Sequence, residues 1–177
     1  MLVLKSLLEG YNPSDPAEVI YKSQMLEILK NCSDCFNRSC RVGHFTGSSW
    51  LLDKTEERFF MMHHKKLDIW LQSGGHADGN ENLLEVAIKE AEEESGLSDI
   101  KAISDKIFDI DVHLFPKIKN DDPHYHFDVR FLLKYEGDEE LKINDESNMI
   151  KWFSRDEFNM KDHSSVSRMF NKWVSIS

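Results

Sequence analysis

The stretch from Gly75 to Leu97, GHADGNENLLEVAIKEAEEESGL, joins a glycine-rich start to a strongly acidic end. In its second half, apolar residues recur at helical spacing, and Gly96 offers the left-handed conformation in which many helices end. The apolar stripe consists of Leu83, Leu84, Ala87, Ile88 and Ala91. The pattern therefore predicts an amphipathic helix over residues 82–95.

Acidic side chains gather on one face of this predicted helix. The stretch has seven acidic residues and one lysine, so most of the chain's formal charge of −10 lies there. Glu90, Glu93 and Glu94 stand at i, i+3 and i+4, opposite the apolar stripe. Such a cluster is either a solvated surface, which the helix alone favours, or a site for a divalent cation such as Mg²⁺ or Mn²⁺, which prefers hard oxygen ligands. The surrounding residues decide between the two.

The same residues nearly fill the Nudix box, so the chain resembles the Nudix hydrolase superfamily. That motif reads Gly, five residues, Glu, seven residues, then Arg-Glu-apolar-x-Glu-Glu-x-Gly-apolar. Its specified positions fall on Gly75, Glu81, Lys89, Glu90, Ala91, Glu93, Glu94, Gly96 and Leu97. The one departure is Lys89, where the family has arginine. Segments 43–48 and 63–78 also resemble one bacterial-type branch, and a match of this length is a specific signal.

The resemblance implies an α/β (α+β) fold, the Nudix fold, in which a mixed β-sheet is sandwiched between α-helices. We expect it over residues 43–177, with residues 1–42 as an N-terminal helical extension packed on the core. The run from Asp15 to Glu18 is typical of a helix start and predicts a helix to about Lys30. Strands are predicted at 44–53, 58–64, 67–72, 108–115, 125–135 and 149–153, and apolar and polar residues alternate clearly in 108–115 and 125–135. An amphipathic pattern predicts a C-terminal helix at 164–174.

Metal binding is the first role that the resemblance implies. Glu90, Glu93 and Glu94 would bind Mg²⁺ or Mn²⁺, with the carbonyl of Gly75 as a further ligand. Hydrolysis of a diphosphate needs cations that neutralise its oxygens and a carboxylate that takes a proton from water. We therefore expect Glu93 and Glu94 to be catalytic.

Three further residues have implied roles at this site. Glu146 lies six residues before Trp152, where family members often have an additional acidic residue, and it is a candidate metal ligand or general base. An exposed loop glutamate is the alternative. Glu81 and Lys89 would support the site by tying the loop to the helix. A lysine at this position keeps the charge but lacks the planar fork of arginine, so it could orient the carboxylates less rigidly.

Four residues are candidate substrate contacts. His126, Asp128 and Arg130 share the polar face of the strand predicted at 125–135. Arg130 could hold a phosphate with two hydrogen bonds, and an ion pair with Asp128 is the alternative. His126, with His124, could contact a phosphate or a second metal, or could be a hydrogen-bonded structural residue. Trp70 could stack on a base or belong to the core.

The cysteines suggest a separate, weaker hypothesis. Cys32, Cys35, Cys40 and His44 have a spacing that a zinc knuckle could use. The alternative is that the thiols stay reduced and pack as small apolar side chains.

Composition limits the classes of partner and location. With 177 residues, 40% hydrophobic, the chain can form one ordinary globular domain. A net charge of −10 argues against binding to a nucleic-acid backbone, and no apolar run is long enough to span a membrane. The start, with Lys5 and Glu9 interrupting its apolar residues, does not resemble a signal peptide. The odd number of cysteines agrees with a cytoplasmic location.

The resemblance implies a metal-dependent hydrolase that cleaves the diphosphate linkage of a nucleoside diphosphate joined to another moiety. Nucleoside triphosphates, nucleotide sugars and dinucleotides all remain open as the small-molecule substrate. The alternative is a catalytically weak or inactive Nudix module that binds a nucleotide as a sensor, and Lys89 is the residue that keeps it open. The N-terminal helix is a candidate site for homodimer contacts.

Overall fold

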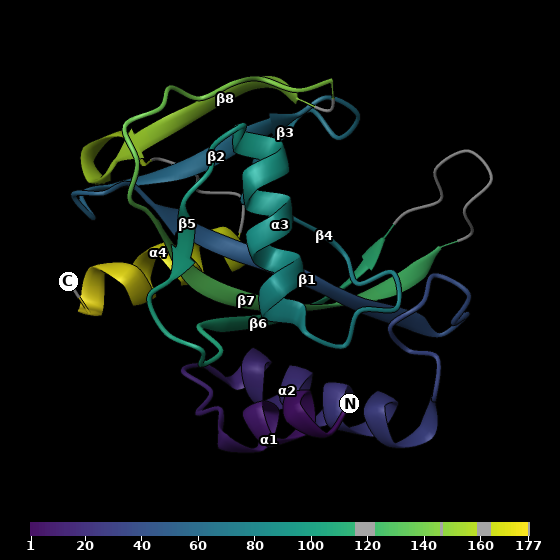
Figure 1. Cartoon of the computed structure of the whole chain (residues 1–177). Helices are drawn as coiled ribbons and strands as arrows, with labels where there is room; N and C mark the ends of the chain where they lie inside the picture. The colour runs from purple at the N-terminus through teal and green to yellow at the C-terminus, as the bar shows by residue number, and fades with distance from the viewer. Residues whose placement is uncertain (116–122, 146, 159–163, 177) are drawn as a thin grey trace.

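The computed structural model describes residues 1–115, 123–145, 147–158 and 164–176 of the chain (Figure 1). Its helices are α1 (Leu2–Gly10), α2 (Pro16–Asn31), α3 (Leu83–Ser95) and α4 (Ser164–Ile176), with a short 3-10 helix at Arg155–Glu157. Its strands are β1 (Gly43–Leu52), β2 (Arg58–His64), β3 (Ile69–Leu71), β4 (Gly74–His76), β5 (Ile100–Ala102), β6 (Asp109–Phe115), β7 (His124–Tyr135) and β8 (Ser147–Ser154). Among the described residues, no helix is both long and apolar enough to cross a membrane.

The strands form one mixed sheet with β1 and β7 at its centre. Its main order is β3-β2-β1-β7-β5, and β4, β6 and β8 are added through β1, β7 and β2. β1 and β7 pair in parallel, which sets His44 opposite His126 and Ser48 opposite Arg130. The other pairs are antiparallel. Side chains at the centre of the sheet therefore come from two segments that are distant in sequence.

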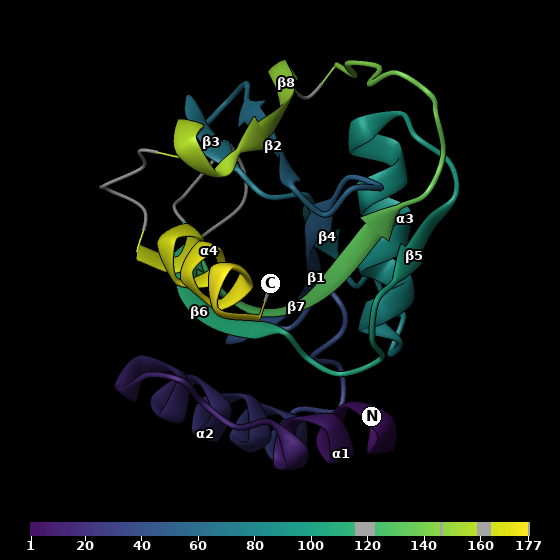
Figure 2. The same ribbon diagram turned by 90° about the vertical axis from the view of Figure 1, so that its left-hand side faces the viewer.

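Helices cover both faces of this sheet. Figure 2 shows α3 on one side of β1 and β7 and α4 on the other, with α1 and α2 lying together beneath β6. Every residue of β1 is buried, as expected for a strand covered on both faces. A larger apolar core lies on the α3 side, and a smaller one around Trp50, Phe59 and Trp173 packs against α4.

The N-terminal helices belong to the larger core. Leu4 and Leu8 of α1 and Met25 and Leu29 of α2 are buried in the same apolar cluster as side chains of α3 and the sheet. Asp15 caps α2 by accepting a hydrogen bond from the Glu18 amide at 3.0 Å. The mixed sheet between helices and this N-terminal helical part confirm the predicted fold class. The domain boundary between residues 42 and 43 stays a prediction.

Some short elements were not predicted, and others differ from their predicted bounds. β4 and β5 were not predicted, because each has only three residues and such short strands show no alternation. The extended segment expected at 67–72 is reduced to β3. α1 was expected only as part of a helical preface. The main helices and the long strands lie where the periodicity placed them.

A buried ionic network joins α2 and α4 to β6. Asp109 of β6 is fully buried and accepts hydrogen bonds from Arg168 at 2.8 Å and from Lys172 at 2.7 Å. Lys172 also contacts Glu18 of α2, whose carboxylate accepts hydrogen bonds from Tyr11 and from Ser14. Buried charges are tolerated when they are paired in this way. The network thus fastens helices from opposite ends of the chain to one strand.

Candidate active site

The candidate site is built where α3 meets β4. The backbone amide of Gly74 donates a hydrogen bond to Glu94 Oε2 at 3.0 Å, and Glu94 is only 6% exposed. A Cβ atom on Gly75 would lie 2.4 Å from the carboxylate of Glu90, so the absence of a side chain lets Glu90 approach the strand. Two of the three predicted metal ligands are therefore held directly against the glycine pair.

Glu93 and Lys89 form the outer edge of the same face. The Glu93 side chain is 57% exposed and pairs with Lys89, whose Nζ lies 3.1 Å from Glu93 Oε2. Nζ is also 3.5 Å from Glu90 Oε1. The hydrogen bond to Glu93 raises the pKa of Lys89, so the amine stays charged. The lysine is exposed and contacts two of the glutamates. Its role in supporting the site stays a prediction.

The other two supporting or catalytic candidates are placed differently. Glu81 is exposed and forms an ion pair with the amino group of Met1. Glu146 lies outside the described residues. The segment that leads to it runs beside the end of α3, because Asn144 Nδ2 donates to the Glu93 carbonyl at 3.3 Å and the Lys142 amide donates to the Ser95 carbonyl at 2.8 Å.

Arg130 and Asp128 form the ion pair that was the alternative to a phosphate contact. Arg130 is 2% exposed, and its guanidinium lies 2.7 Å from Asp128, 3.0 Å from Asp109 and 3.4 Å from Asp111. Burial opposes its charge, but the three carboxylates outweigh burial and raise its pKa. Asp128 also accepts hydrogen bonds from Thr46 and Ser48 on β1. The contacts of both residues thus link neighbouring strands.

Trp70, the aromatic candidate, lies on β3 and is half-buried. Its ring makes edge contacts with His63, at a centroid distance of 5.3 Å, and with Phe153, at 4.9 Å. It packs against the smaller apolar core. Its contact with a base stays a prediction.

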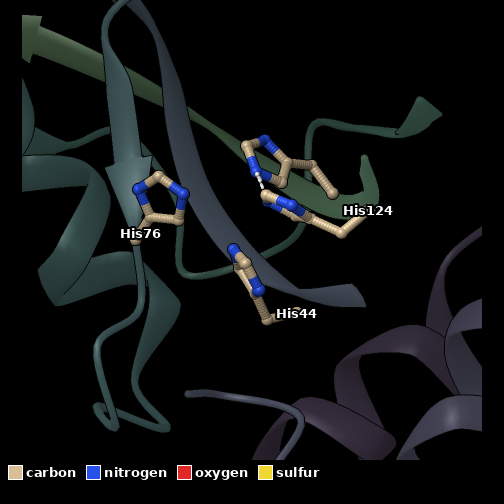
Figure 3. A group of neighbouring side chains, drawn as sticks. His44, His76 and His124 are labelled. Atoms are coloured by element: carbon tan, nitrogen blue, oxygen red, sulfur yellow. Dashed lines mark hydrogen bonds between the residues drawn. The ribbon is translucent and has the colours of Figure 1, made fainter. Parts of the chain in front are cut away.

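His126 belongs to a group of four histidines that the sequence did not reveal. His44 on β1, His76 on β4 and His124 on β7 surround one space (Figure 3), and His126 of β7 completes the group. His44 is 2% exposed, and neither ring nitrogen has a hydrogen-bond partner among the described residues. Burial, with the neighbouring histidines, lowers the pKa of His44 to about 4 and that of His126 to about 2. The imidazoles of His44 and His126 are therefore neutral at pH 7.

The predicted zinc knuckle is divided between two places. Cys32 and Cys40 have their sulfur atoms 2.7 Å apart, and Asp34 lies 3.0 Å from Cys32 Sγ. Cys35 is fully buried, in the larger apolar core. His44 is a member of the histidine group instead. Four residues that are near one another in sequence thus do not form one cluster, because His44 is the second residue of β1 and its ring contacts His76 of β4 and His124 and His126 of β7.

Comparison with known proteins identifies the class of protein. A family model described as the NUDIX domain matches residues 46–174, and the chain belongs to the Nudix family. No curated protein matches the sequence. Among solved structures, the C. elegans Ap4A hydrolase binary complex is 17% identical with a TM-score of 0.57, covering 75% of this chain and 96% of that one.

Two other solved structures have the same fold. The MutT protein from Methanosarcina mazei is 14% identical with a TM-score of 0.58, covering 75% of this chain and 93% of its own. A UDP-X diphosphatase, also 14% identical, has a TM-score of 0.57 and covers 99% of this chain and 93% of its own. At these identities the likeness shows the fold alone.

Proposed function

We propose that the chain is a metal-dependent hydrolase that cleaves the diphosphate linkage of a nucleoside diphosphate joined to another group. The observation that carries this proposal is the arrangement of Glu90 and Glu94 against Gly74 and Gly75, with Glu93 exposed beside them. Structures of similar fold include an Ap4A hydrolase and a UDP-X diphosphatase, which supports a substrate with linked phosphates. Nucleoside triphosphates, nucleotide sugars and dinucleotides are the substrates to be tested.

The chemistry of the donor set suits a hard divalent cation, Mg²⁺ or Mn²⁺. Glu90, Glu93 and Glu94 offer carboxylate oxygens from one helix face, and Gly75 leaves the space that Glu90 occupies. When bound, the cation neutralises charge on the diphosphate and lowers the pKa of an attacking water. The amide of Gly74 fixes the orientation of Glu94.

Glu93 and Glu146 are our candidates for proton transfer. Glu93 is exposed and can accept a proton from water while Lys89 holds its side chain near the site. Glu146 remains our candidate for an additional ligand or general base. Its support is indirect, since residues 142–144 contact the end of α3. A cytoplasmic location and a homodimer also stay predictions.

A nucleotide-binding sensor with little or no turnover is the second candidate. The contacts of Lys89 favour it, because an exposed amine pairs with Glu93 and lies 3.5 Å from Glu90. A metal ion must displace the amine from these carboxylates, so the amine weakens metal binding. A flexible lysine also orients the carboxylates less firmly than an arginine would. This candidate predicts binding without hydrolysis.

One experiment separates the two candidates. The purified protein is incubated, first in Mg²⁺ and then in Mn²⁺, with a panel of candidate substrates. The panel contains nucleoside triphosphates, ADP-ribose, NADH, dinucleoside polyphosphates and nucleotide sugars. The release of phosphate and pyrophosphate is measured. Glu93→Gln should lower kcat/KM on any active substrate by about 100-fold or more. Glu92→Gln, the same change one residue earlier on α3, is the matched control and should keep activity. Metal-dependent nucleotide binding in calorimetry without any turnover would favour the sensor and reject the hydrolase.

A further inference from the structure

We propose that His44, His76, His124 and His126 form a second metal site, for a borderline transition-metal ion such as Zn²⁺, distinct from the carboxylate site on α3. The four residues come from three strands that meet at one end of the sheet. Each offers a ring nitrogen, and these four atoms all lie within 4.8 Å of one another. The proposal does not depend on hydrolase activity.

The strand register brings the four rings together. His44 of β1 lies directly opposite His126 of β7, and His76 of β4 pairs two residues along β1, at Thr46. His124 is two residues from His126 and therefore on the same face of β7. Figure 3 shows the rings of His44, His76 and His124 facing a common space. Three strands are thus needed to assemble the site.

The distances between the ring nitrogens are close to those that binding of one metal ion requires. The Nε2 atoms of His124 and His126 are 3.0 Å apart. The ring centroid of His44 lies 4.7 to 5.1 Å from the ring centroids of the other three histidines. A tetrahedral Zn²⁺ with Zn–N bonds of about 2.0–2.1 Å would hold its nitrogen ligands roughly 3.3–3.4 Å apart. Small rotations of the rings would bring the remaining nitrogens to that separation.

His44 supplies an independent observation that points to a ligand. Its side chain is 2% exposed, and among the described residues neither Nδ1 nor Nε2 has a hydrogen-bond partner. The next polar side chains on the same face of β1, Thr46 and Ser48, both donate to Asp128 at under 3 Å. Buried polar groups in proteins are nearly always partnered. A metal ion at the centre of the group would take the lone pair of one His44 nitrogen.

The chemistry of the donor set selects the class of metal. The four residues of the group are all histidines, and neutral imidazole suits Zn²⁺, Cu²⁺, Ni²⁺ and Fe²⁺ far better than Mg²⁺. The carboxylates of Glu90, Glu93 and Glu94 have the opposite preference. The chain would therefore hold two sites of different selectivity that do not compete for the same ion.

A metal at this site would also position the catalytic face. His76 follows Gly75, where a Cβ atom would meet the Glu90 carboxylate, and the amide of Gly74 donates to Glu94. Holding His76 to β1 and β7 would fix the glycine pair between the sheet and α3. This effect is an indirect one, through the backbone, and the histidines need not touch the substrate.

Metal binding by the full chain tests the proposal. Protein freed of metal by a chelator is titrated with Zn²⁺ in the presence of excess Mg²⁺, which occupies the carboxylate site, and X-ray absorption at the zinc edge identifies the ligands. We expect one tightly bound Zn²⁺ with a shell of imidazole nitrogens and a rise in the thermal unfolding temperature. The double variant His76→Gln/His124→Gln changes two residues that are only partly buried. Its affinity for Zn²⁺ should fall by more than about 100-fold, because loss of a residue that only supports a metal ligand already costs ~10–100-fold.

Two control variants make the result decisive. His63→Gln removes a histidine of β2 outside the group and should bind Zn²⁺ as the wild type does. Cys32→Ser removes one ligand of a separate group of potential ligands among the described residues, Cys32, Asp34 and Cys40. Circular dichroism in chelator verifies that each variant is folded. Any of three results would overturn the proposal. The first is a shell of sulfur ligands around the zinc, and the second is Zn²⁺ binding that survives the double histidine change but is lost in Cys32→Ser. The third is no Zn²⁺ binding above the Mg²⁺ background.

Discussion

Single atoms decide the geometry of the carboxylate site. At Gly75 a Cβ would occupy the position of the Glu90 carboxylate, 2.4 Å from its Cδ and Oε2 atoms. The clashing group is the end of a flexible side chain, which can move away without disturbing the backbone. A methyl group at this position is therefore expected to displace Glu90, a proposed metal ligand, rather than to unfold the protein.

We predict that Gly75→Ala separates metal binding from stability. The affinity for Mg²⁺ or Mn²⁺, measured by calorimetry, should fall by roughly 10–100-fold, the range found when the surroundings of a metal ligand are disturbed. The free energy of unfolding without metal should change by less than about 1 kcal/mol. Unchanged metal affinity in a folded variant would show that Glu90 is not a ligand.

At the scale of elements, the packing of α3 on β1 depends on a different glycine. A Cβ on Gly47 would lie 2.6 Å from the Leu83 carbonyl oxygen and 3.0 Å from the side chain of Val86. Here the obstacle is the backbone of the first turn of α3, which cannot rotate away. The helix as a whole would have to move from the strand.

Gly47→Ala is therefore expected to lower stability, in contrast to the change at Gly75. Overpacking of this kind costs about 1–3 kcal/mol, which chemical denaturation can measure directly. The two alanine variants are matched controls for each other, because each adds one methyl group to a glycine next to α3. Equal stability of Gly47→Ala and the wild type would contradict the close approach of β1 and α3.

Elements with a strong local pattern could be predicted from the sequence. The acidic helix, the long strand β7 and the capped start of α2 at Asp15 all depend on residues near one another in the chain. The contacts of Arg130 with Asp109 and Asp111 could not be predicted, because they require the pairing of β6 with β7. The meeting of His44 with His76 and His126 could not either, because it requires the pairing of β1 with β4 and with β7. Periodicity indicates which face of a strand is polar but does not identify the strand that pairs with it.

At the scale of the whole molecule, acid should weaken the network that fastens the N- and C-terminal helices to β6. Burial opposes ionisation of Glu18, but hydrogen bonds from Lys172, Ser14 and Tyr11 outweigh it and hold its pKa at about 2. Burial likewise opposes ionisation of Asp111, whereas His113 and Arg130 lower its pKa to about 2. In the unfolded chain these groups titrate at about 3.9–4.3. Their stabilisation is therefore complete above about pH 5 and lost as the pH falls toward 2.

Glu18→Gln tests this dependence. At pH 7 the variant should be less stable than the wild type by about 3 kcal/mol, because Lys172 loses a buried charged partner. Lys172 keeps its partner Asp109, and Arg168 still lies beside position 18. The difference should shrink as the pH is lowered from 5 to 2, since the wild-type carboxylate becomes protonated. Denaturant unfolding at each pH measures the difference in stability. A difference that stays constant over this range would be inconsistent with a depressed pKa for Glu18.

The parallel pairing of β1 with β7 also determines when the protein can fold. Thr46 and Asp128, which are hydrogen-bonded across that pair, are 82 positions apart in the chain. At ~5–20 residues per second, a ribosome needs several seconds to make the intervening segment. During that interval β1 has no central partner, and the apolar side of α3 has only part of the surface that it later covers. Contacts of such long range slow folding. The concentrated negative charge of the acidic helix would then make nascent chains repel one another before the sheet closes.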